Sequence, residues 1–330
     1  MKVRTVAVTA GDANGIGAEV ALKAAWKERG AGTRIVLVGH RAVWERAAAA
    51  CGAELPEEWD LLAGGGPELY TWDPGMGAAP RCAWGKVRKD AAVAAYGYIL
   101  AATSAALNGH VDAVVTAPIN KEGFQAAGIP APGHTELLAK LTGAKRYAMM
   151  LFGKRIRVVL ATRHLPLRKV ADALTREAVE EAVTMLAEGL AWMGWKSPRI
   201  GVCGLNPHAG DGGALGDEER RIVAPAVATC RKRGIRAEGP IAADAIFHRH
   251  LRGDFEGVVA MYHDQGLGPM KMDSFEDGVN LTLGLPIVRT SPDHGTAYDL
   301  AGKGAANAGS MVSAVQWAKK LAARRNPWKA

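Results

Sequence analysis

Three histidines of this 330-residue chain follow apolar runs, and imidazoles in such positions can hold a metal ion. They are His164, His208 and His263, which lie 44 and 55 residues apart, so no local ligand motif such as HExxH joins them. If the preceding runs are strands of one sheet, the three rings can meet at its carboxyl edge. Three neutral imidazoles with one open position form a catalytic divalent-metal site, in which the ion acts as a Lewis acid on a substrate oxygen. The alternative is that each ring hydrogen-bonds its own turn.

A second group of residues has the chemistry of anion binding. His134 and Thr135 precede a short helical stretch, where Thr135 could cap the helix or offer its hydroxyl and N–H to a ligand. Lys271, Asn280 and Arg289 follow at intervals of nine residues. Lys and Arg supply charge-assisted donors to phosphate or carboxylate, and Asn supplies a neutral donor. Read singly, each of these residues is equally typical of an ordinary surface.

The chain also contains a glycine-rich stretch, Asp293–Asn307, close to its C-terminus. This stretch is neither a GxGxxG fingerprint nor a Walker A loop, because the glycine and lysine spacings do not match. The glycines of Gly11–Gly17 are also spaced wrongly for a dinucleotide fingerprint. That segment instead indicates a strand–loop–helix turn that needs the backbone freedom of glycine.

Short β-branched runs alternate with segments whose apolar residues recur every three or four positions, which predicts a mostly parallel sheet covered by helices. The predicted strands are Arg4–Thr9, Arg34–Val38, Ala113–Thr116, Arg155–Leu160, Arg199–Cys203, Gly257–Met261 and Leu285–Val288. The predicted helices are Ala18–Arg29, Asp90–Asn108, Leu167–Gly189 and Glu218–Arg233. Gly52–Arg88 is rich in Gly, Pro and Trp and is expected to be a surface excursion. Polar clusters follow most strands, where open α/β sheets bind ligands, so an enzyme is favoured over a scaffold.

Composition excludes several classes of protein. Hydrophobic residues make up 48% and charged residues 22%, which is enough for a large core. No apolar stretch is expected to reach the roughly 18 residues of a membrane span. Four separated cysteines without a CxxC pair are typical of reduced thiols in the cytoplasm. The net charge is +8, but no nucleic-acid recognition motif accompanies it, so the basic C-terminal tail is interpreted as a solvated helix end.

Several segments in order resemble one known family. The most specific are Gly133–Glu136, Asn206–Gly210, Ala260–Gly266, Asn280–Pro286 and Asp293–Ala297. With them, nearly the whole chain resembles the 4-hydroxythreonine-4-phosphate dehydrogenase (PdxA-like) family of vitamin B6 biosynthesis. The resemblance implies an α/β fold with two α/β/α domains around a cleft, of the isocitrate/isopropylmalate dehydrogenase type. It implies a cofactor-side domain of residues 1–128 plus 285–330, and a metal, substrate and dimerisation domain of residues 129–284.

Carried over by position, the resemblance assigns the same residues to the metal and anion sites. His164, His208 and His263 match the metal ligands. The residues that match substrate-binding positions are His134, Thr135, Lys271, Asn280 and Arg289. Imidazole ligation favours Zn²⁺, and Co²⁺, Mn²⁺ or Mg²⁺ could also support activity. Asp244 or Asp264 could orient a ligating imidazole or relay a proton, and the sequence does not decide between them.

The glycine-rich stretch resembles the adenosine-binding loop of isopropylmalate dehydrogenases. Asp299 falls where an acid accepts hydrogen bonds from the ribose hydroxyls, and this favours NAD over NADP because the carboxylate would repel a 2′-phosphate. The alternative is that Asp299 caps the following helix. The residues expected to contact the cofactor are His294, Gly295, Thr296, Asp299 and Asn307. The family also implies a homodimer with its active site at the subunit boundary.

The implied reaction is the NAD-dependent oxidation and decarboxylation of 4-phosphooxy-L-threonine to 3-amino-2-oxopropyl phosphate. Lys271 would help to fix the substrate against the cofactor. A paralogue acting on 4-phospho-D-threonate or 4-phospho-D-erythronate is the main alternative. Ala13 and Ala18 stand where the family usually has prolines, and Ala242–Ala245 lacks the family's Pro and Thr/Ser, which leaves the exact substrate open. Related cis-dihydrodiol enzymes need no phosphate site, and a binding protein without catalysis would not need the three histidines.

Overall fold

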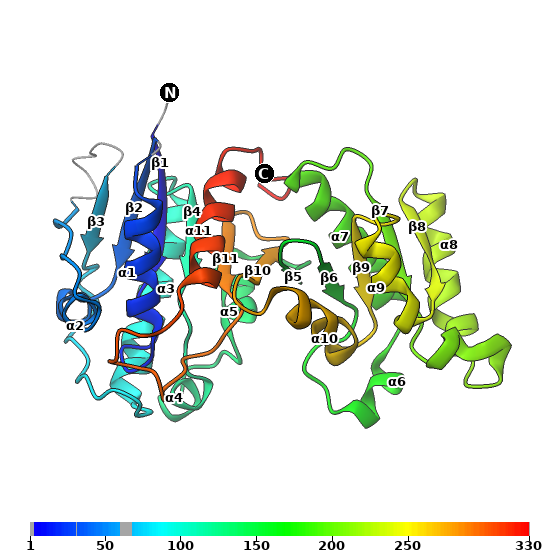
Figure 1. Cartoon of the computed structure of the whole chain (residues 1–330), viewed down its shortest axis with the longest axis horizontal. Coiled ribbons are helices and arrows are strands. Elements are labelled where there is room, and N and C mark those ends of the chain that lie inside the picture. Colours follow the sequence, from blue (N-terminus) through cyan, green and yellow to red (C-terminus); the bar gives the residue numbers. More distant parts are fainter. Residues whose placement is uncertain (1–2, 31, 60–67, 330) are drawn as a thin grey trace. The chain divides into compact units, whose positions relative to one another are not determined.

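Parallel strands flanked by helices make up both halves of the chain, which confirms the predicted α/β class (Figure 1). The structure is a computed structural model and describes residues 3–30, 32–59 and 68–329. The chain forms two compact units. The first combines Met1–Lys145 with Leu285–Ala330, and the second is Arg146–Gly284.

The first unit contains five parallel strands in the order β3-β2-β1-β4-β11. Their bounds are β1 (Arg4–Thr9), β2 (Thr33–Val38), β3 (Leu69–Trp72), β4 (Ala113–Thr116) and β11 (Val288–Pro292). All six residues of β2 and all four of β4 are buried. Strands buried on both faces are continuous apolar runs, and this explains why the sequence pattern located most of them.

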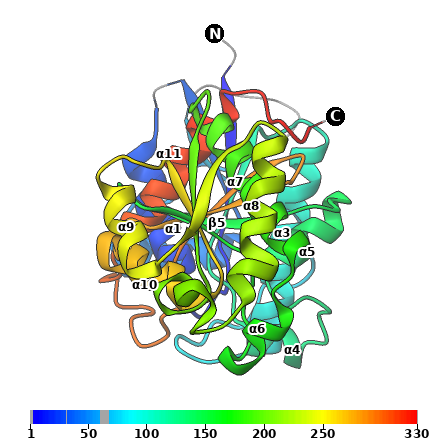
Figure 2. The ribbon, with the colours of Figure 1, turned by 90° about the vertical axis from the view of Figure 1, so that its right-hand side faces the viewer.

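Helices cover both faces of this sheet (Figures 1 and 2). They are α1 (Gly17–Glu28), α2 (Arg41–Cys51), α3 (Lys89–Leu107), α4 (Lys121–Ala126), α5 (His134–Thr142) and α11 (Gly309–Ala322). α1 and α11 pack on each other on one face, while α3 packs on β1 and β4 from the other face and carries α4 and α5. The last residues of β1, β4 and β11 therefore lie along one edge of the sheet, as in all parallel arrangements.

The second unit contains six strands in the order β10-β5-β6-β9-β7-β8. The bounds are β5 (Ala148–Phe152), β6 (Arg157–Leu160), β7 (Arg199–Cys203), β8 (Arg236–Ile241), β9 (Gly257–Ala260) and β10 (Val279–Leu283). β6, β9, β7 and β8 are parallel, whereas β5 is antiparallel to both β6 and β10. The carboxyl ends of β6, β9 and β7 are thus neighbours, and each is followed by one of the three histidines.

Helices cover the second sheet in the same way (Figure 2). The α-helices are α6 (Val170–Ala173), α7 (Arg176–Met193), α8 (Ala224–Lys232), α9 (Ala243–Leu251) and α10 (His263–Ser274). Three further short segments are η1 (Leu167–Lys169), η2 (Pro207–Gly213) and η3 (Glu219–Val223). α7 and α8 pack together on one face, and α9 and α10 pack on the other. A core that includes Val158, Val258 and Phe255 fills the space between the sheet and its helices.

Three predicted elements differ from the structure. β11 begins at Val288, not at Leu285, because Pro286 has no N–H to donate to a neighbouring strand. The predicted helix 167–189 is interrupted after Leu174, since the Thr175 hydroxyl accepts a hydrogen bond from Ala178 N and starts α7. The expected surface excursion contains β3, which is buried at Leu69, although residues 60–67 of it lie outside the described residues.

The boundary between the two units lies later in the chain than the predicted domain boundary at residue 128. Residues 129–145, which include α5, belong to the first unit. The cause is local packing, because Leu137 and Leu138 are buried and α5 lies against α3. His134 and Thr135 are consequently part of the first unit rather than the second.

The expectation that no apolar stretch is long enough to cross a membrane is wrong for α3. Its 19 residues meet that test by length and composition. However, 61% of its most apolar window is buried inside the protein, which is the behaviour of a core helix.

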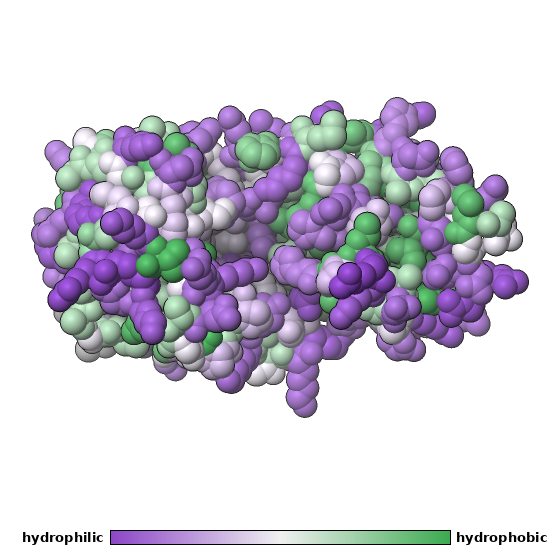
Figure 3. All heavy atoms as spheres, turned by 90° about the horizontal axis from the view of Figure 1, so that it is seen from below, coloured by the Kyte–Doolittle hydropathy of each residue, from purple (hydrophilic) through white to green (hydrophobic). Residues whose placement is uncertain are grey.

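The face shown in Figure 3 is mainly hydrophilic, with apolar residues in separate patches.

Candidate functional site

Two of the three predicted metal ligands lie together at the carboxyl ends of β6 and β9. His164 and His263 follow these parallel neighbours, and their ring centroids are 5.6 Å apart. Two imidazoles on one tetrahedral ion, with each nitrogen about 2.1 Å from the metal, place their ring centres roughly 5 Å apart. His164 also has a φ of 27°, a strained backbone conformation for a residue with a side chain. The pair therefore fits two ligand positions of one metal site.

Asp264 holds the ring of His263. Its Oδ1 lies 2.7 Å from His263 Nδ1, and this contact makes Nδ1 the protonated nitrogen and leaves Nε2 with the lone pair that a metal requires. Asp244 lies exposed in the first turn of α9. Of the two aspartates considered from the sequence, Asp264 is thus the one in contact with a predicted ligand.

The loops that follow β6, β9 and β7 are joined by hydrogen bonds. The Thr162 hydroxyl donates to Met261 O at 2.7 Å. The Gln265 side chain accepts from Met261 N at 2.7 Å and donates to Gly204 O at 2.8 Å. Sequence reasoning missed Gln265, although it stands in the polar segment that includes His263. Because Gln265 is buried, these bonds fix the loop of the histidine pair relative to the loop after β7.

His208 lies apart from this pair, exposed on the η2 loop. Residues 208–212 all have positive φ, and the buried carboxylate of Glu219 holds the loop by accepting from Leu205 N and Asn206 N at 2.8 and 2.7 Å. Within residues 3–30, 32–59 and 68–329, no group of three or more His, Cys, Asp or Glu side chains is placed to hold a metal ion. One chain in this conformation therefore brings together two of the three predicted ligands, and the role of His208 stays a prediction.

A pocket of about 240 Å³ opens beside the histidine pair. Its lining residues are Thr162, Arg163, His164, Leu165, Leu167, Val170, Tyr262, His263 and Asp264. Apolar walls around a few polar groups are typical of small-molecule sites, since low water content strengthens each polar contact. Arg163 was not among the predicted site residues.

In the first unit, Arg289 is a buried cation beside the end of β4. It is 1% exposed, and its Nε and Nη2 donate to the Thr116 hydroxyl at 3.1 and 2.6 Å. Burial lowers the pKa of the guanidinium to about 9, and the nearby Glu136 carboxylate opposes this shift. The group remains charged at neutral pH. The charge and the planar donor set of the guanidinium make this position chemically suited to an anionic ligand.

His134 lies near Arg289, at the first position of α5. Its Nε2 is buried and has no hydrogen-bond partner among the residues that the structure describes. Burial, and then the charges of Arg289 and Lys121, lower the pKa of this imidazole well below its usual value, so the ring is neutral. The helix cap is Gly133, not Thr135, and the buried Thr135 therefore belongs to the first turn of α5. An unpaired ring nitrogen beside a buried cation is typical of a ligand-binding position.

Lys271 and Asn280 belong to the second unit, whereas His134, Thr135 and Arg289 belong to the first. Lys271 lies on α10 with its Nζ 5.6 Å from the centre of the Phe275 ring. Asn280 lies on β10, and its Oδ1 is buried without a hydrogen-bond partner in the described chain. Each unit thus carries polar groups that the protein itself leaves incompletely bonded.

The glycine-rich stretch forms an ordered loop against α1. The buried Glu19 carboxylate accepts from Gly302 N at 2.6 Å and from Gly304 N at 2.8 Å. Lys23 Nζ donates to the carbonyls of Gly304 and Ala306 at 2.6 and 2.9 Å. Gly304 has a φ of 61°, and a side chain there would meet the carbonyl oxygen of Ala50. Sequence reasoning missed Glu19 and Lys23, because charged residues in a helix normally indicate its solvent face.

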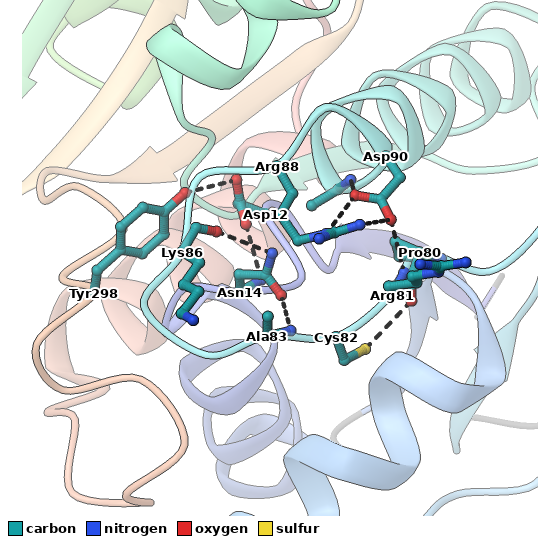
Figure 4. Close-up of polar contacts among 11 residues, drawn as sticks. Asp12, Asn14, Pro80, Arg81, Cys82, Ala83, Lys86, Arg88, Asp90 and Tyr298 are labelled. Carbon is teal, nitrogen blue, oxygen red and sulfur yellow. Dashed lines mark hydrogen bonds and ion pairs between the residues drawn. The ribbon is translucent and has the colours of Figure 1, made fainter.

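A second set of contacts joins this loop to the segment after β1 (Figure 4). The Tyr298 hydroxyl donates to Asp12 Oδ2 at 3.0 Å, and Asn14 N donates to Asp12 Oδ1 at 2.8 Å. Burial raises the pKa of the Asp12 carboxyl and, together with the charge of Asp12, that of the Tyr298 phenol. The Asn14 side chain in turn accepts from Ala83 N at 2.7 Å. The predicted cofactor loop is therefore fixed at Tyr298 and at Gly302 and Gly304 by the buried side chains of Asp12 and Glu19.

The five predicted cofactor residues lie on or beside this loop. Gly295 and Asp299 are exposed, and His294 Nδ1 contacts Gly295 O at 3.0 Å. Thr296 O accepts from Ile16 N at 3.0 Å. Asn307 Oδ1 accepts from Gly309 N at 2.7 Å at the start of α11, so Asn307 and not Asp299 bonds to that helix end.

Comparison with known proteins identifies relatives over almost the whole chain. Residues 31–318 match the family model described as pyridoxal phosphate biosynthetic protein PdxA. The 4-hydroxythreonine-4-phosphate dehydrogenase of Geobacter metallireducens is 44% identical over 96% of this chain and 95% of its own. The D-threonate 4-phosphate dehydrogenase of Salmonella typhimurium is 41% identical over 98% of this chain and 100% of its own.

A solved structure agrees with these relatives. The crystal structure of 4-hydroxythreonine-4-phosphate dehydrogenase from Klebsiella pneumoniae superposes with a TM-score of 0.87 at 40% identity, and the match covers 97% of this chain and 98% of that one. Both the fold and the sequence therefore agree along most of the chain. The chain belongs to the PdxA family of dehydrogenases.

Proposed function

We propose that this protein oxidises 4-phosphooxy-L-threonine with NAD and releases carbon dioxide, giving 3-amino-2-oxopropyl phosphate for pyridoxal phosphate synthesis. The observation that carries the proposal is the buried Arg289 together with the half-buried His134, whose Nε2 is buried. A charged guanidinium and a neutral imidazole with an unpaired Nε2 are suited to a phosphate or carboxylate oxygen. The relatives named as dehydrogenases of phosphorylated hydroxy acids support this substrate class.

His164, His208 and His263 would hold a divalent metal, with Zn²⁺ favoured by their imidazoles. When bound, the metal supplies a Lewis acid for the substrate hydroxyl. Within the chain, Asp264 keeps the proton on His263 Nδ1, and Gln265 keeps the loop in place. Lys271 and Asn280, with Arg289 and Thr135, would bind the substrate and fix its reacting carbon.

We also propose that a homodimer completes this site. Leu167 is 71% exposed, Met272 91% and Phe275 77%, and these apolar side chains need a cover. Leu167 also lines the pocket beside His164 and His263. A second copy that covers Leu167 would close that pocket to water.

For the cofactor, we propose NAD bound at the loop that Glu19 and Lys23 hold. His294, Gly295, Thr296 and Asn307 would surround the adenosine, and the exposed Asp299 carboxylate would accept hydrogen bonds from the ribose hydroxyls. A 2′-phosphate in the same place would be repelled by that carboxylate. Preformed loops bind with a smaller loss of conformational entropy, and the buried contacts of this loop provide that advantage.

A second function is favoured by the relatives themselves. D-threonate 4-phosphate dehydrogenases are 41% and 42% identical to this chain, close to the 44% of the 4-hydroxythreonine-4-phosphate enzyme. The two substrates differ at C2, where one carries an ammonium group and the other a hydroxyl. Oxidation of 4-phospho-D-threonate is therefore the alternative activity.

NADH formation with both phosphorylated acids tests the proposal. The purified protein should reduce NAD with 4-phosphooxy-L-threonine at a higher kcat/KM than with 4-phospho-D-threonate, and a chelator should stop the reaction until Zn²⁺, Co²⁺ or Mn²⁺ is restored. A preference for 4-phospho-D-threonate would establish the alternative function. No NADH from any phosphorylated hydroxy acid would reject both.

A further inference from the structure

Arg163 stands between Thr162 and His164 in the loop that follows β6, and no role has been assigned to it above. We propose that Arg163 binds an oxyanion of the substrate, a carboxylate or a phosphate, beside the paired histidines. This inference rests on the proposed function, because it names a further substrate-binding residue for that reaction. Three independent features of the residue carry it.

The first feature is the stacking of the side chain. The Arg163 guanidinium carbon lies 5.0 Å from the centre of the Tyr147 ring. A guanidinium that stacks on an aromatic ring uses its face, so the N–H groups along its edge remain directed outward in a fixed plane. Such a plane is the geometry with which arginine recognises a carboxylate or a phosphate through two parallel hydrogen bonds. The contact with Tyr147 thus orients the guanidinium N–H groups before any ligand binds.

The second feature is an incomplete hydrogen-bond set. Arg163 Nη1 is buried and finds no hydrogen-bond partner in the part of the chain that the structure describes. A buried, unpaired donor on a charged group destabilises the folded protein, so proteins rarely keep one unless water or a ligand satisfies it. An oxyanion would supply the missing acceptor and also neutralise the charge. The same argument identified His134 in the first unit.

The third feature is the pocket. Arg163 lines the same space of about 240 Å³ as His164 and His263, and among its nine lining residues it is the one with a permanent positive charge. The other charged lining group, Asp264, contacts His263 Nδ1 at 2.7 Å. The Thr162 hydroxyl is also engaged, since it donates to Met261 O. An anion that enters this pocket is therefore attracted chiefly by Arg163.

The substrate class contains a group that Arg163 could bind. A phosphorylated hydroxy acid carries a carboxylate at one end and a phosphate at the other, with the reacting hydroxyl between them. A cation beside the histidine pair would hold one of these two anionic groups. Arg163 would therefore act as a binding residue that aligns the hydroxyl with the histidine pair.

Two substitutions and one control test this role. R163A removes the guanidinium group, and R163K keeps the positive charge but loses the planar pair of N–H donors. R168A is the matched control, because Arg168 is an exposed arginine of the same loop that does not line the pocket. We expect the substrate KM to rise about 10- to 100-fold in R163A, which is the effect of losing charge-assisted hydrogen bonds. The rise in R163K should be smaller. The KM for NAD, the bound metal and the melting temperature should stay at wild-type values, as should every constant of R168A.

Substrate analogues then identify the group that Arg163 binds. One analogue lacks the phosphate, and another carries a methyl ester in place of the carboxylate. For the analogue that lacks the contacted group, R163A and wild type should have equal kcat/KM, whereas for the other analogue the difference should persist. A kcat/KM of R163A within twofold of wild type on every substrate would overturn the inference. So would a lower melting temperature with an unchanged substrate KM, which is the result of a purely structural role.

The test also separates this inference from the proposed function. If wild type turns over none of the phosphorylated acids, the proposed function fails. Calorimetric titration of 4-phospho-D-threonate into wild type and R163A then measures binding directly. A binding constant at least tenfold weaker in R163A would support the anion-binding role, and equal binding constants would refute it.

Discussion

The cofactor-side loop and the histidine pocket represent two different ways of building a site. Glu19, Lys23 and Asp12 satisfy the polar groups of the loop at 293–307 with buried hydrogen bonds. By contrast, the pocket of His164 and His263 includes a buried Arg163 nitrogen that has no hydrogen-bond partner among the described residues, and it exposes the apolar Leu167. The loop is thus complete within one chain. We propose that the pocket is completed by a metal, an anion and a second subunit.

The difference predicts how each region responds to substitution. If NAD binds as proposed, changes in the loop should alter the affinity for the cofactor and little else, since a preformed loop loses little conformational entropy on binding. Changes in the pocket should alter the chemical step or substrate binding, because its groups act on what enters. The predictions below test this contrast, beginning with the largest expected effect.

His263→Ala should lower kcat/KM by about 10³-fold or more, because it removes a predicted metal ligand whose ring Asp264 already orients. Metal content of the purified variant, measured by atomic absorption, should fall in parallel. His248→Ala is the control, since His248 is an exposed histidine of the same unit. If the His263→Ala variant keeps full activity after treatment with chelator, the proposed role of a metal in the reaction is wrong.

Arg289→Ala should raise the substrate KM by about 10²-fold, because it deletes a buried cation that we propose to bind an anionic group of the substrate. The KM for NAD should be unchanged. Arg289→Lys keeps the charge and should recover part of the affinity, which separates binding from a folding defect. An unchanged substrate KM in a folded Arg289→Ala protein would exclude this residue from the anion site.

Glu19→Gln should raise the KM for NAD by about tenfold and leave kcat within about twofold, since an amide offers one acceptor oxygen where the carboxylate offers two. The exposed Glu45→Gln on α2, whose carboxylate pairs with Arg41 at the surface, serves as the control. Steady-state kinetics with varied NAD measures the effect. A fall in kcat with an unchanged KM for NAD would mean that the two regions are not separable in this way.

The sequence predicted the framework and the site-bearing loops better than the contacts within them. Buried strands such as β4 are apolar on both faces, and polar residues such as His164 and His263 stand directly after strands, so both features can be located from the pattern. The roles of Glu19 and Gln265 could not be predicted from the pattern. A buried carboxylate or amide is recognised only from its hydrogen-bond partners, which lie far along the chain. The extent of β11 was misjudged for a simpler reason, since the missing N–H of Pro286 delays the strand.

The grouping of the three histidines shows a second limit of the sequence. The sequence places each of them after a predicted strand, and the structure brings two rings to 5.6 Å. The position of the third ring depends on the η2 loop, whose run of residues with positive φ no apolar pattern predicts. The apolar periodicity of one chain also cannot predict whether a second subunit contributes residues to a site.

Asp299→Ala should narrow the preference for NAD over NADP by about fivefold, because it removes one charge–dipole contact and the repulsion of a 2′-phosphate. Ratios of kcat/KM for the two cofactors give the measurement. Asp254→Ala is a suitable control, since it changes an exposed aspartate far along the sequence that pairs with Arg249. An unchanged ratio would leave Asp299 as a surface residue of the loop.

The smallest effect concerns acid stability. His250 is buried on α9, with Nδ1 2.8 Å from Phe255 O and Nε2 accepting from Arg157 N at 3.2 Å. Burial, and then the charge of Arg157, lower the pKa of His250 below its ordinary value of 6.5. The unfolded chain therefore binds a proton more readily than the folded one between the lowered pKa and pH 6.5. Stability should be constant above that range and decline as the pH falls through it.

Urea unfolding at several pH values tests this sign. The free energy of unfolding of wild type should fall as the pH drops below 6.5, and His250→Gln should show a shallower slope because glutamine does not titrate in that range. Some slope should remain, since burial also lowers the pKa of His134. Saturating phosphate should not restore the contribution of His250, whose nitrogens are bonded inside the core, whereas it should protect the region of His134 and Arg289. Equal slopes in wild type and His250→Gln would show that the buried ring does not control acid stability.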